Sequence, residues 1–196
     1  MLIAEGDTER AARPHLKLFL DAQAGALPKV RLEIVVLDGG LTERLVRSLA
    51  TEFLLDSSVV GVIALTDLYP KFPDAASARS MIASWMPGDT RCHVAVAKHD
   101  FEAWLLVGWD AILSQARVGK KQQWGANPED VNHNHPPAHR MQKLFDTGPR
   151  SRRYKKPVDG KKLFERLDLL EVAKRCPEFK LFLNCMLQCA AYPLLP

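Results

Sequence analysis

The sequence predicts an α/β protein in which a parallel sheet of about four strands is flanked by helices. Short apolar segments alternate with longer segments of helical periodicity, in the order β-α-β-α-β-α-β-α. The segment at residues 59–65, VVGVIAL, is apolar on both faces, as a central strand of a parallel sheet must be. Hydrophobic residues make up 47% of the 196 positions and charged residues 26%, which indicates a folded globular chain.

Four strands are expected from short apolar segments that end at polar or turn-forming residues. In chain order they lie at residues 1–4, 30–37, 59–65 and 92–97. The first ends at Glu5-Gly6, and the second is ended by Asp38-Gly39-Gly40. The third ends at Thr66-Asp67, and the fourth leads into His99-Asp100. Polar side chains therefore follow every strand.

Helices are expected between the strands, where apolar residues recur three or four positions apart. They lie at about residues 7–24, 41–55, 75–85 and 101–115. In the first, Asp7 or Thr8 can cap the start, and Ala12, Leu16 and Leu20 share one face. Right-handed crossovers between parallel strands place such helices on both faces of the sheet.

The amino-acid composition and charge of the chain change beyond residue 116. Residues 1–116, the expected α/β core, hold 11 Lys and Arg against 15 Asp and Glu. Residues 117–196 form a basic extension, with 16 Lys and Arg against 8 Asp and Glu up to residue 180. It is expected to pack on the core and to contain helices at about 138–145, 161–174 and 177–191. Acid gathered in one half and base in the other suits an enzyme that holds metal in one place and a polyanion in another.

Carboxylates follow three of the expected strands. Glu5 follows the first, Asp67 the third and Glu102 the fourth, while Glu9 lies in the first helical turn and can point back to the same edge. Ligands bind outside the carboxyl ends of parallel strands, and hard oxygen ligands suit Mg²⁺ or Mn²⁺. For Glu9 and Glu102 the helix dipole offers a structural alternative, since it favours acids at any helix start.

Segments of the sequence, in the same order, resemble a bacterial TOPRIM-like family related to the OLD and RloB nucleases. The first, Glu5-Gly6-Asp7-Thr8-Glu9, is similar to the EGxTE opening of TOPRIM domains. The others lie at residues 67–73, 99–106, 127–132, 154–160 and 176–183. The resemblance therefore covers nearly the whole chain.

The resemblance implies a Rossmann-like TOPRIM core and a metal-dependent nucleic-acid enzyme. It implies that Glu5 is a metal ligand and general acid or base, with Glu9 as its partner. It makes Asp67 the first acid of a DxD motif and Glu102 the acid of a later strand–helix junction. Members are often encoded beside an ABC- or SMC-like ATPase, which implies such a partner and a role in defence against phage.

The chain departs from the family pattern at Tyr69. This residue stands at the second acid of the DxD motif and offers no carboxylate. A single metal ion, or a catalytically inactive subunit, would accommodate the change. Asp74, five residues further on, is a candidate substitute.

A basic segment lies in the extension. Its cations are Arg150, Arg152, Arg153, Lys155 and Lys156. They are expected to contact nucleic-acid phosphates, with the intervening Tyr stacking on a base; a solvated loop is the alternative. Lys155 or Lys156 is also a candidate to stabilise charge in a transition state.

The expected function is a metal-dependent endonuclease acting on DNA or on RNA, tRNA included. The alternatives are an inactive subunit that binds an ATPase or nucleic acid, and a nucleotidyl transferase whose nucleotide contacts the sequence does not identify. No apolar segment approaches the roughly 20 residues that span a bilayer, and the start of the chain is unlike a signal peptide. A cytoplasmic protein without membrane contact is expected, and a homo-oligomer is left open.

Overall fold

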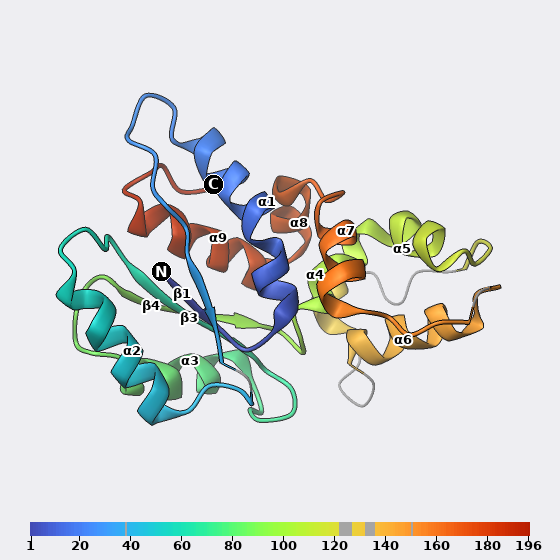
Figure 1. Cartoon of the computed structure of the whole chain (residues 1–196), viewed down its shortest axis with the longest axis horizontal. Coiled ribbons are helices and arrows are strands. Elements are labelled where there is room, and N and C mark those ends of the chain that lie inside the picture. The colour runs from blue at the N-terminus through green and yellow to red at the C-terminus, as the bar shows by residue number, and fades with distance from the viewer. Residues whose placement is uncertain (38, 122–126, 132–135, 150) are drawn as a thin grey trace.

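The structure is a computed structural model, and it describes residues 1–37, 39–121, 127–131, 136–149 and 151–196 (Figure 1). Its sheet has four strands: β1 (Leu2–Ala4), β2 (Ile34–Val36), β3 (Val62–Asp67) and β4 (Cys92–Ala97). All pairings are parallel and the order is β2-β1-β3-β4. The predicted class, a four-stranded parallel sheet flanked by helices with further helices after it, is confirmed.

The strand order creates a switch point in the sheet. The chain moves from β1 outward to β2, returns to the other side of β1 as β3, and continues outward to β4. Crossover connections therefore leave β1 and β3 in opposite directions. The crevice outside the carboxyl ends of two such strands is where open α/β sheets bind ligands.

Helices cover both faces of the sheet (Figure 1). α1 (Asp7–Gln23) and α9 (Pro177–Cys189) lie on one face, and α2 (Glu43–Leu55) and α3 (Ala75–Trp85) lie on the other. Successive side chains of a strand therefore point alternately to the two faces of the sheet. In β3, Ile63 and Leu65 join the core beneath α1 and α9, whereas Val62 and Ala64 join the core beneath α2 and α3.

The second strand is shorter than predicted. Residues 30–37 were expected to be extended throughout, but only Ile34–Val36 pair with β1. The register places Leu2 opposite Ile34, so earlier residues have no counterpart in β1. Val30 is held instead by a side chain: the Tyr192 hydroxyl accepts from the Val30 amide at 3.2 Å and donates to the Pro28 carbonyl at 2.5 Å.

The predicted helix at 101–115 is divided. It consists of α4 (Glu102–Leu105), a 3₁₀ turn η1 (Leu106–Gly108) and α5 (Trp109–Ala116). A Cβ at Gly108 would lie 2.7 Å from Cδ2 of Leu167, so the break allows the later segment to pack closely. Periodicity alone does not report such a distant contact.

The predicted helix at 161–174 is also two helices, α7 (Lys161–Phe164) and α8 (Leu169–Arg175). The Asp168 side chain accepts hydrogen bonds from the amides of Leu170 and Glu171, so it starts α8 as an N-cap. The remaining elements are a 3₁₀ turn, η2 (Pro128–Asp130), the helix α6 (Pro137–Thr147) and a π-helical turn, η3 (Lys156–Gly160).

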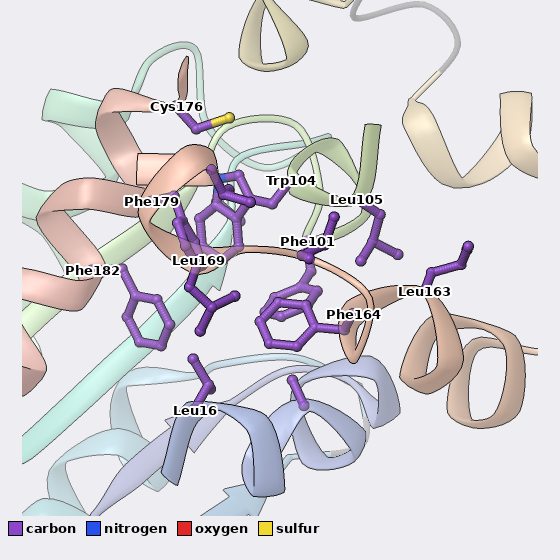
Figure 2. Packing of buried hydrophobic residues seen from close by; sticks show 14 of the residues in the cluster. Leu16, Phe101, Trp104, Leu105, Leu163, Phe164, Leu169, Cys176, Phe179 and Phe182 are labelled. Carbon is purple, nitrogen blue, oxygen red and sulfur yellow. The ribbon is translucent and has the colours of Figure 1, made fainter. Parts of the chain in front are cut away.

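An aromatic cluster joins the later helices to the sheet (Figure 2). The Trp104 ring stacks on Phe182 with centroids 5.7 Å apart and lies 4.8 Å from Phe179. The Trp104 indole donates to Glu129 at 2.8 Å, and Glu129 also accepts the amides of Glu178 and Phe179 at the start of α9. One buried carboxylate thus ties α4, η2 and α9 together. Among the described residues, no helix combines the length and apolar character needed to cross a bilayer.

Candidate functional site

The carboxyl edge of the sheet carries the predicted acids. Glu5 follows β1 directly, Asp67 is the last residue of β3, and Glu102 begins α4 after β4. Because β1 and β3 flank the switch point, Glu5 and Asp67 lie at its mouth. We call these residues, together with Glu9 and Asp100, the acid edge.

Glu9 folds back toward this edge from the first turn of α1. A Cβ at Gly6 would lie 2.8 Å from Oε2 of Glu9, so Gly6 leaves room for the carboxylate. Glu9 is buried, and burial together with the charge of Glu102 raises its pKa to about 7. A residue serving only to complement the helix dipole would remain in solvent, so this position indicates more than capping.

Asp67 has one oxygen without a partner. Its Oδ1 is shielded from solvent and accepts no hydrogen bond from the described residues. Burial raises the pKa of Asp67, and the negative charges of Glu9 and Asp100 raise it further. A shielded oxygen among like charges is one that a cation would stabilise.

Asp100 belongs to the same group, although it was not predicted as a ligand from the sequence. It is buried, and its Oδ2 accepts the Ala138 amide at 3.1 Å while Oδ1 has no hydrogen-bond partner among the described residues. Burial and the charge of Glu102 raise its pKa to about 8. The signal available in the sequence was the position of Asp100 directly after a strand, but this position was interpreted as the start of a helix.

Two threonine hydroxyls orient two of the carboxylates. The Thr8 hydroxyl donates to Oε1 of Glu102 at 2.9 Å, and both residues are buried. The Thr66 hydroxyl donates to Oε1 of Glu5 across the switch point. Each hydroxyl leaves the second oxygen of its carboxylate for another group.

Two lysines occupy those second oxygens. Nζ of Lys71 lies 2.8 Å from Oε2 of Glu5, and Nζ of Lys156 lies 3.3 Å from Oε2 of Glu102. Burial alone would lower the pKa of Lys156, but the carboxylates of Glu102 and Asp100 raise it above the ordinary value. Lys156 was predicted from the basic segment of the sequence, whereas Lys71, in the Pro-rich loop at residues 69–73 after β3, was not.

Gly40 makes room for the Lys71–Glu5 pair. A Cβ at Gly40 would lie 2.2 Å from Nζ of Lys71 and 2.9 Å from Oε2 of Glu5. Its φ of +92° is itself a conformation that favours glycine. The loop after β2 therefore contributes to the acid edge by the absence of a side chain.

The donor chemistry fits Mg²⁺ or Mn²⁺, although the side chains are not already in ligand positions. Among the described residues, no three Asp, Glu, His or Cys side chains converge in the arrangement of a metal site. Glu5 and Glu102 are instead turned toward lysines. The unpartnered oxygens of Asp67 and Asp100 and the exclusively carboxylate donors are those that hard divalent cations take.

Neither Tyr69 nor Asp74 supplies the missing second acid of the motif. Tyr69 is 40% exposed, and its amide donates to the carbonyl of His99. Asp74 is the exposed N-cap of α3 and accepts the Ser77 amide at 2.7 Å, which lowers its pKa. Asp74 is therefore occupied as a helix cap.

The basic segment divides between internal pairing and solvent. Arg150 lies outside the described residues. Arg152 forms an internal pair with Asp159, with contacts of 2.7 and 2.9 Å, whereas Arg153 and Lys155 are exposed. Arg152 is therefore already paired within the protein, and the contact of these cations with nucleic-acid phosphates stays a prediction.

The prediction that Tyr154 stacks on a nucleic-acid base does not fit its position in the structure. Its ring is 9% exposed and packs against Phe145, with centroids 5.3 Å apart. Burial and the nearby carboxylates of Glu102 and Asp100 raise the pKa of its hydroxyl. Tyr154 instead packs behind the acid edge, as part of the segment that delivers Lys156.

Comparison with known proteins gives one match. The family described as Domain of unknown function (DUF4276) matches residues 4–187. No curated protein and no solved structure shows significant similarity to the chain.

Proposed function

The chain belongs to the DUF4276 family, and we propose that it is a metal-dependent nucleic-acid phosphodiesterase of the TOPRIM type. The observation that carries the proposal is the acid edge itself. Five carboxylates gather along the carboxyl edge of a parallel sheet, and two of them have a shielded oxygen that accepts no hydrogen bond from the described residues. Buried acids whose pKa values are raised by burial and by like-charged neighbours are candidates for a functional site, and a bound divalent cation would offset their mutual repulsion.

The residues suited to hold Mg²⁺ or Mn²⁺ are Glu5, Glu9, Asp67 and Glu102, with Asp100 beside them. A bound ion would polarise a phosphoryl oxygen and lower the pKa of a bound water. The donors come from β1, α1, β3 and the β4–α4 junction, so rigid elements rather than long loops position them.

The chain's own cations have separate parts in this proposal. Lys156 lies on Glu102 and is half-exposed, so its ammonium can also reach a phosphate at the edge and oppose charge that develops on its oxygens. Lys71 neutralises Glu5 before a divalent cation arrives. Glu9, with a pKa of about 7, lies in the range at which a carboxyl group gives and takes protons near neutral pH.

The test is cleavage of DNA and RNA substrates with Mg²⁺ or Mn²⁺, together with Mn²⁺ binding measured by paramagnetic resonance. Glu5→Gln and Asp67→Asn should each lower cleavage by about 10³-fold or more, equivalent to about 4 kcal/mol, and should weaken Mn²⁺ binding. Glu43→Gln is the matched control, because Glu43 is an exposed helical acid that pairs with Arg47. Full activity in both edge variants would exclude the proposed site.

A second candidate function is a subunit without catalysis that binds nucleic acid or an ATPase. Tyr69 favours it, because the position that the TOPRIM pattern gives to a second acid has no carboxylate. Mn²⁺ binding without cleavage, both alone and with an ABC- or SMC-like ATPase added, would support this candidate. Cleavage that appears only with the ATPase would support a nuclease effector of an ATPase-coupled antiviral system, the role that the resemblance suggests.

A further inference from the structure

We propose that a pocket among the later helices binds a phosphate group of the nucleic-acid strand that reaches the acid edge. The choice of a nucleic-acid strand as ligand rests on the proposed function. The pocket has a volume of about 390 Å³. Its lining includes four cations and two supporting side chains, namely Arg117, Arg152, Lys162, Arg166, Gln115 and Phe145. We call it the basic pocket.

The basic pocket is assembled from segments far apart in the sequence. The end of α5 supplies Gln115 and Arg117, α6 supplies Phe145, and α7 with the turn after it supplies Lys162 and Arg166. Figure 1 shows α5, α6 and α7 gathered at one end of the molecule, away from α2 and α3. Convergence of cations from separate elements distinguishes the pocket from a charged face on a single helix.

One of the four cations is fixed in place. The Arg152 guanidinium forms two contacts with Asp159 and lies 4.6 Å from the centroid of the Phe145 ring. The Gln115 amide also donates to Oδ1 of Asp159, at 3.0 Å. Asp159 neutralises Arg152 but holds it against the pocket, so the wall is built before any ligand arrives.

The other three cations give the pocket its excess charge. Arg117, Lys162 and Arg166 form no ion pair with another residue in the part of the chain that the structure describes. The C-terminus of α5, which also borders the pocket, contributes about half a negative charge. Three positive charges therefore exceed what the neighbouring helix end requires, and an anion would supply the balance.

The conformation of Arg117 favours a role for its side chain. Its φ is +57°, and it ends α5 in the left-handed region, with the Val118 amide donating to the Leu113 carbonyl. Glycine is the usual residue at such a helix end, because a side chain is strained there. An arginine is therefore a poor choice for the turn alone.

A short stretch of chain connects the basic pocket with the acid edge. Arg152 lines the pocket, and Lys156 contacts Glu102. Four residues of extended chain place the Cα atoms of Arg152 and Lys156 at most about 14 Å apart, a separation that a strand of several nucleotides spans. A phosphate in the basic pocket would therefore position a strand whose nearby bond lies at the acid edge.

The test is binding of a 12-nucleotide single strand, as DNA and as RNA, in EDTA, followed by fluorescence anisotropy over a range of salt concentrations. The double variant Lys162→Ala/Arg166→Ala should reduce the slope of log affinity against log salt by about 1.4, and weaken binding about 25-fold at 0.1 M salt, as expected for two lost phosphate contacts. The control double variant is Lys161→Ala/Lys174→Ala. Those lysines pair with Glu165 and Glu171 and do not line the pocket.

Arg117→Gly separates binding from folding. It should leave the melting temperature unchanged or raise it, because glycine relieves the left-handed strain, and should weaken binding about fivefold at 0.1 M salt. Equal slopes in the pocket and control double variants would overturn the proposal. A second outcome would also overturn it: inorganic phosphate protects the pocket arginines from a guanidinium-reactive reagent, but the oligonucleotide does not. That result would assign the pocket to a free phosphate.

Because EDTA prevents metal-dependent turnover, this binding test does not depend on catalysis. Intact, pocket-dependent binding in a protein that never cleaves would contradict the proposed function and support the pocket. Metal-dependent cleavage with no contribution of the pocket to binding would support the proposed function and contradict the role of the pocket.

Discussion

Asp100 and Asp159 are both buried aspartates, but their surroundings have opposite effects on their charge. Asp100, at the acid edge, has one oxygen without a hydrogen-bond partner in the described part of the chain and a like-charged neighbour, Glu102, and its pKa is raised to about 8. Asp159 lies behind the basic pocket. Burial alone would raise its pKa as well, but hydrogen bonds from Arg152, the Lys155 amide and Gln115 hold it below the ordinary value.

The difference shows how a structural carboxylate differs from one that is available to a ligand. Asp159 has a partner for each oxygen, so its charge stabilises the fold around it. Asp100 has one oxygen that accepts no hydrogen bond from the described residues, and it lies close to other acids, so its ionisation is disfavoured in the folded state. Burial alone did not separate them, because the two residues are 7% and 2% exposed.

The largest expected effect is on the pH dependence of folding in EDTA. The unfolded chain releases the Asp100 proton near its ordinary pKa of about 4, but the native protein does so only near 8. Between these values the unfolded state binds fewer protons, so the free energy of unfolding falls as pH rises. We expect Asp100→Asn to remove part of this fall. Its stability relative to wild type should improve by about 3 kcal/mol from pH 5 to 8, below the limit of about 4 kcal/mol for one proton over three pH units, because water relaxes the cost.

Chemical denaturation at several pH values measures this effect. Asp21→Asn is a suitable control, because Asp21 is a partly exposed helical acid paired with Lys17. If Asp100→Asn changed the free energy of unfolding by the same amount at all pH values, Asp100 would be ionised in the native protein. The like charges would then be better compensated than the geometry indicates.

The same substitution at Asp159 should have the opposite sign. Asp159→Asn removes the charge that holds Arg152, and we expect the free energy of unfolding to fall by about 2 kcal/mol at pH 7. This is less than for a fully buried pair, because the Arg152 side chain is 39% exposed and can be rehydrated. A depressed folded pKa stabilises above the unfolded value, so the difference from wild type should shrink as pH falls below about 4. Stabilisation at pH 7 would remove the distinction between the two aspartates.

The sequence was sufficient for the part of the site that is local in the chain. Glu5, Asp67 and Glu102 each follow an apolar strand, and parallel strands deliver such residues to one edge. Asp100 and Lys71 could not be assigned in this way. Their partners, Ala138 and Glu5, lie 38 and 66 residues away, and no periodicity reports contacts at that separation.

The same limit explains the fold. The four strands and their order along the chain were predicted from short apolar segments, but two long helices were predicted where four shorter ones exist. The break near Gly108 depends on Leu167, which packs against it from a segment that the local pattern does not include. The prediction for Tyr154 did not fit the structure for a similar reason. A tyrosine between cations is expected to be exposed, and the sequence does not show that the fold packs its ring against Phe145.

The smallest expected effect concerns Lys71, the cation that partly compensates the acid edge. Gly39 and Gly40 have nearly the same φ, +94° and +92°, so alanine at either should strain the backbone alike and cost about 1 kcal/mol of stability. Only at Gly40 would the added Cβ meet Nζ of Lys71, at 2.2 Å, whereas at Gly39 it meets nothing within 4 Å. The flexible lysine should yield and leave Glu5.

We therefore expect Gly40→Ala to bind Mn²⁺ about two- to fivefold more tightly than Gly39→Ala, the range for loss of one competing, partly exposed ion pair. Isothermal titration calorimetry of both variants measures the difference. In the Lys71→Met background the two alanine variants should bind Mn²⁺ alike, because the displaced ammonium is already absent. If the difference persists there, the added Cβ acts on Glu5 itself, 2.9 Å away, and Lys71 does not compete with the metal ion.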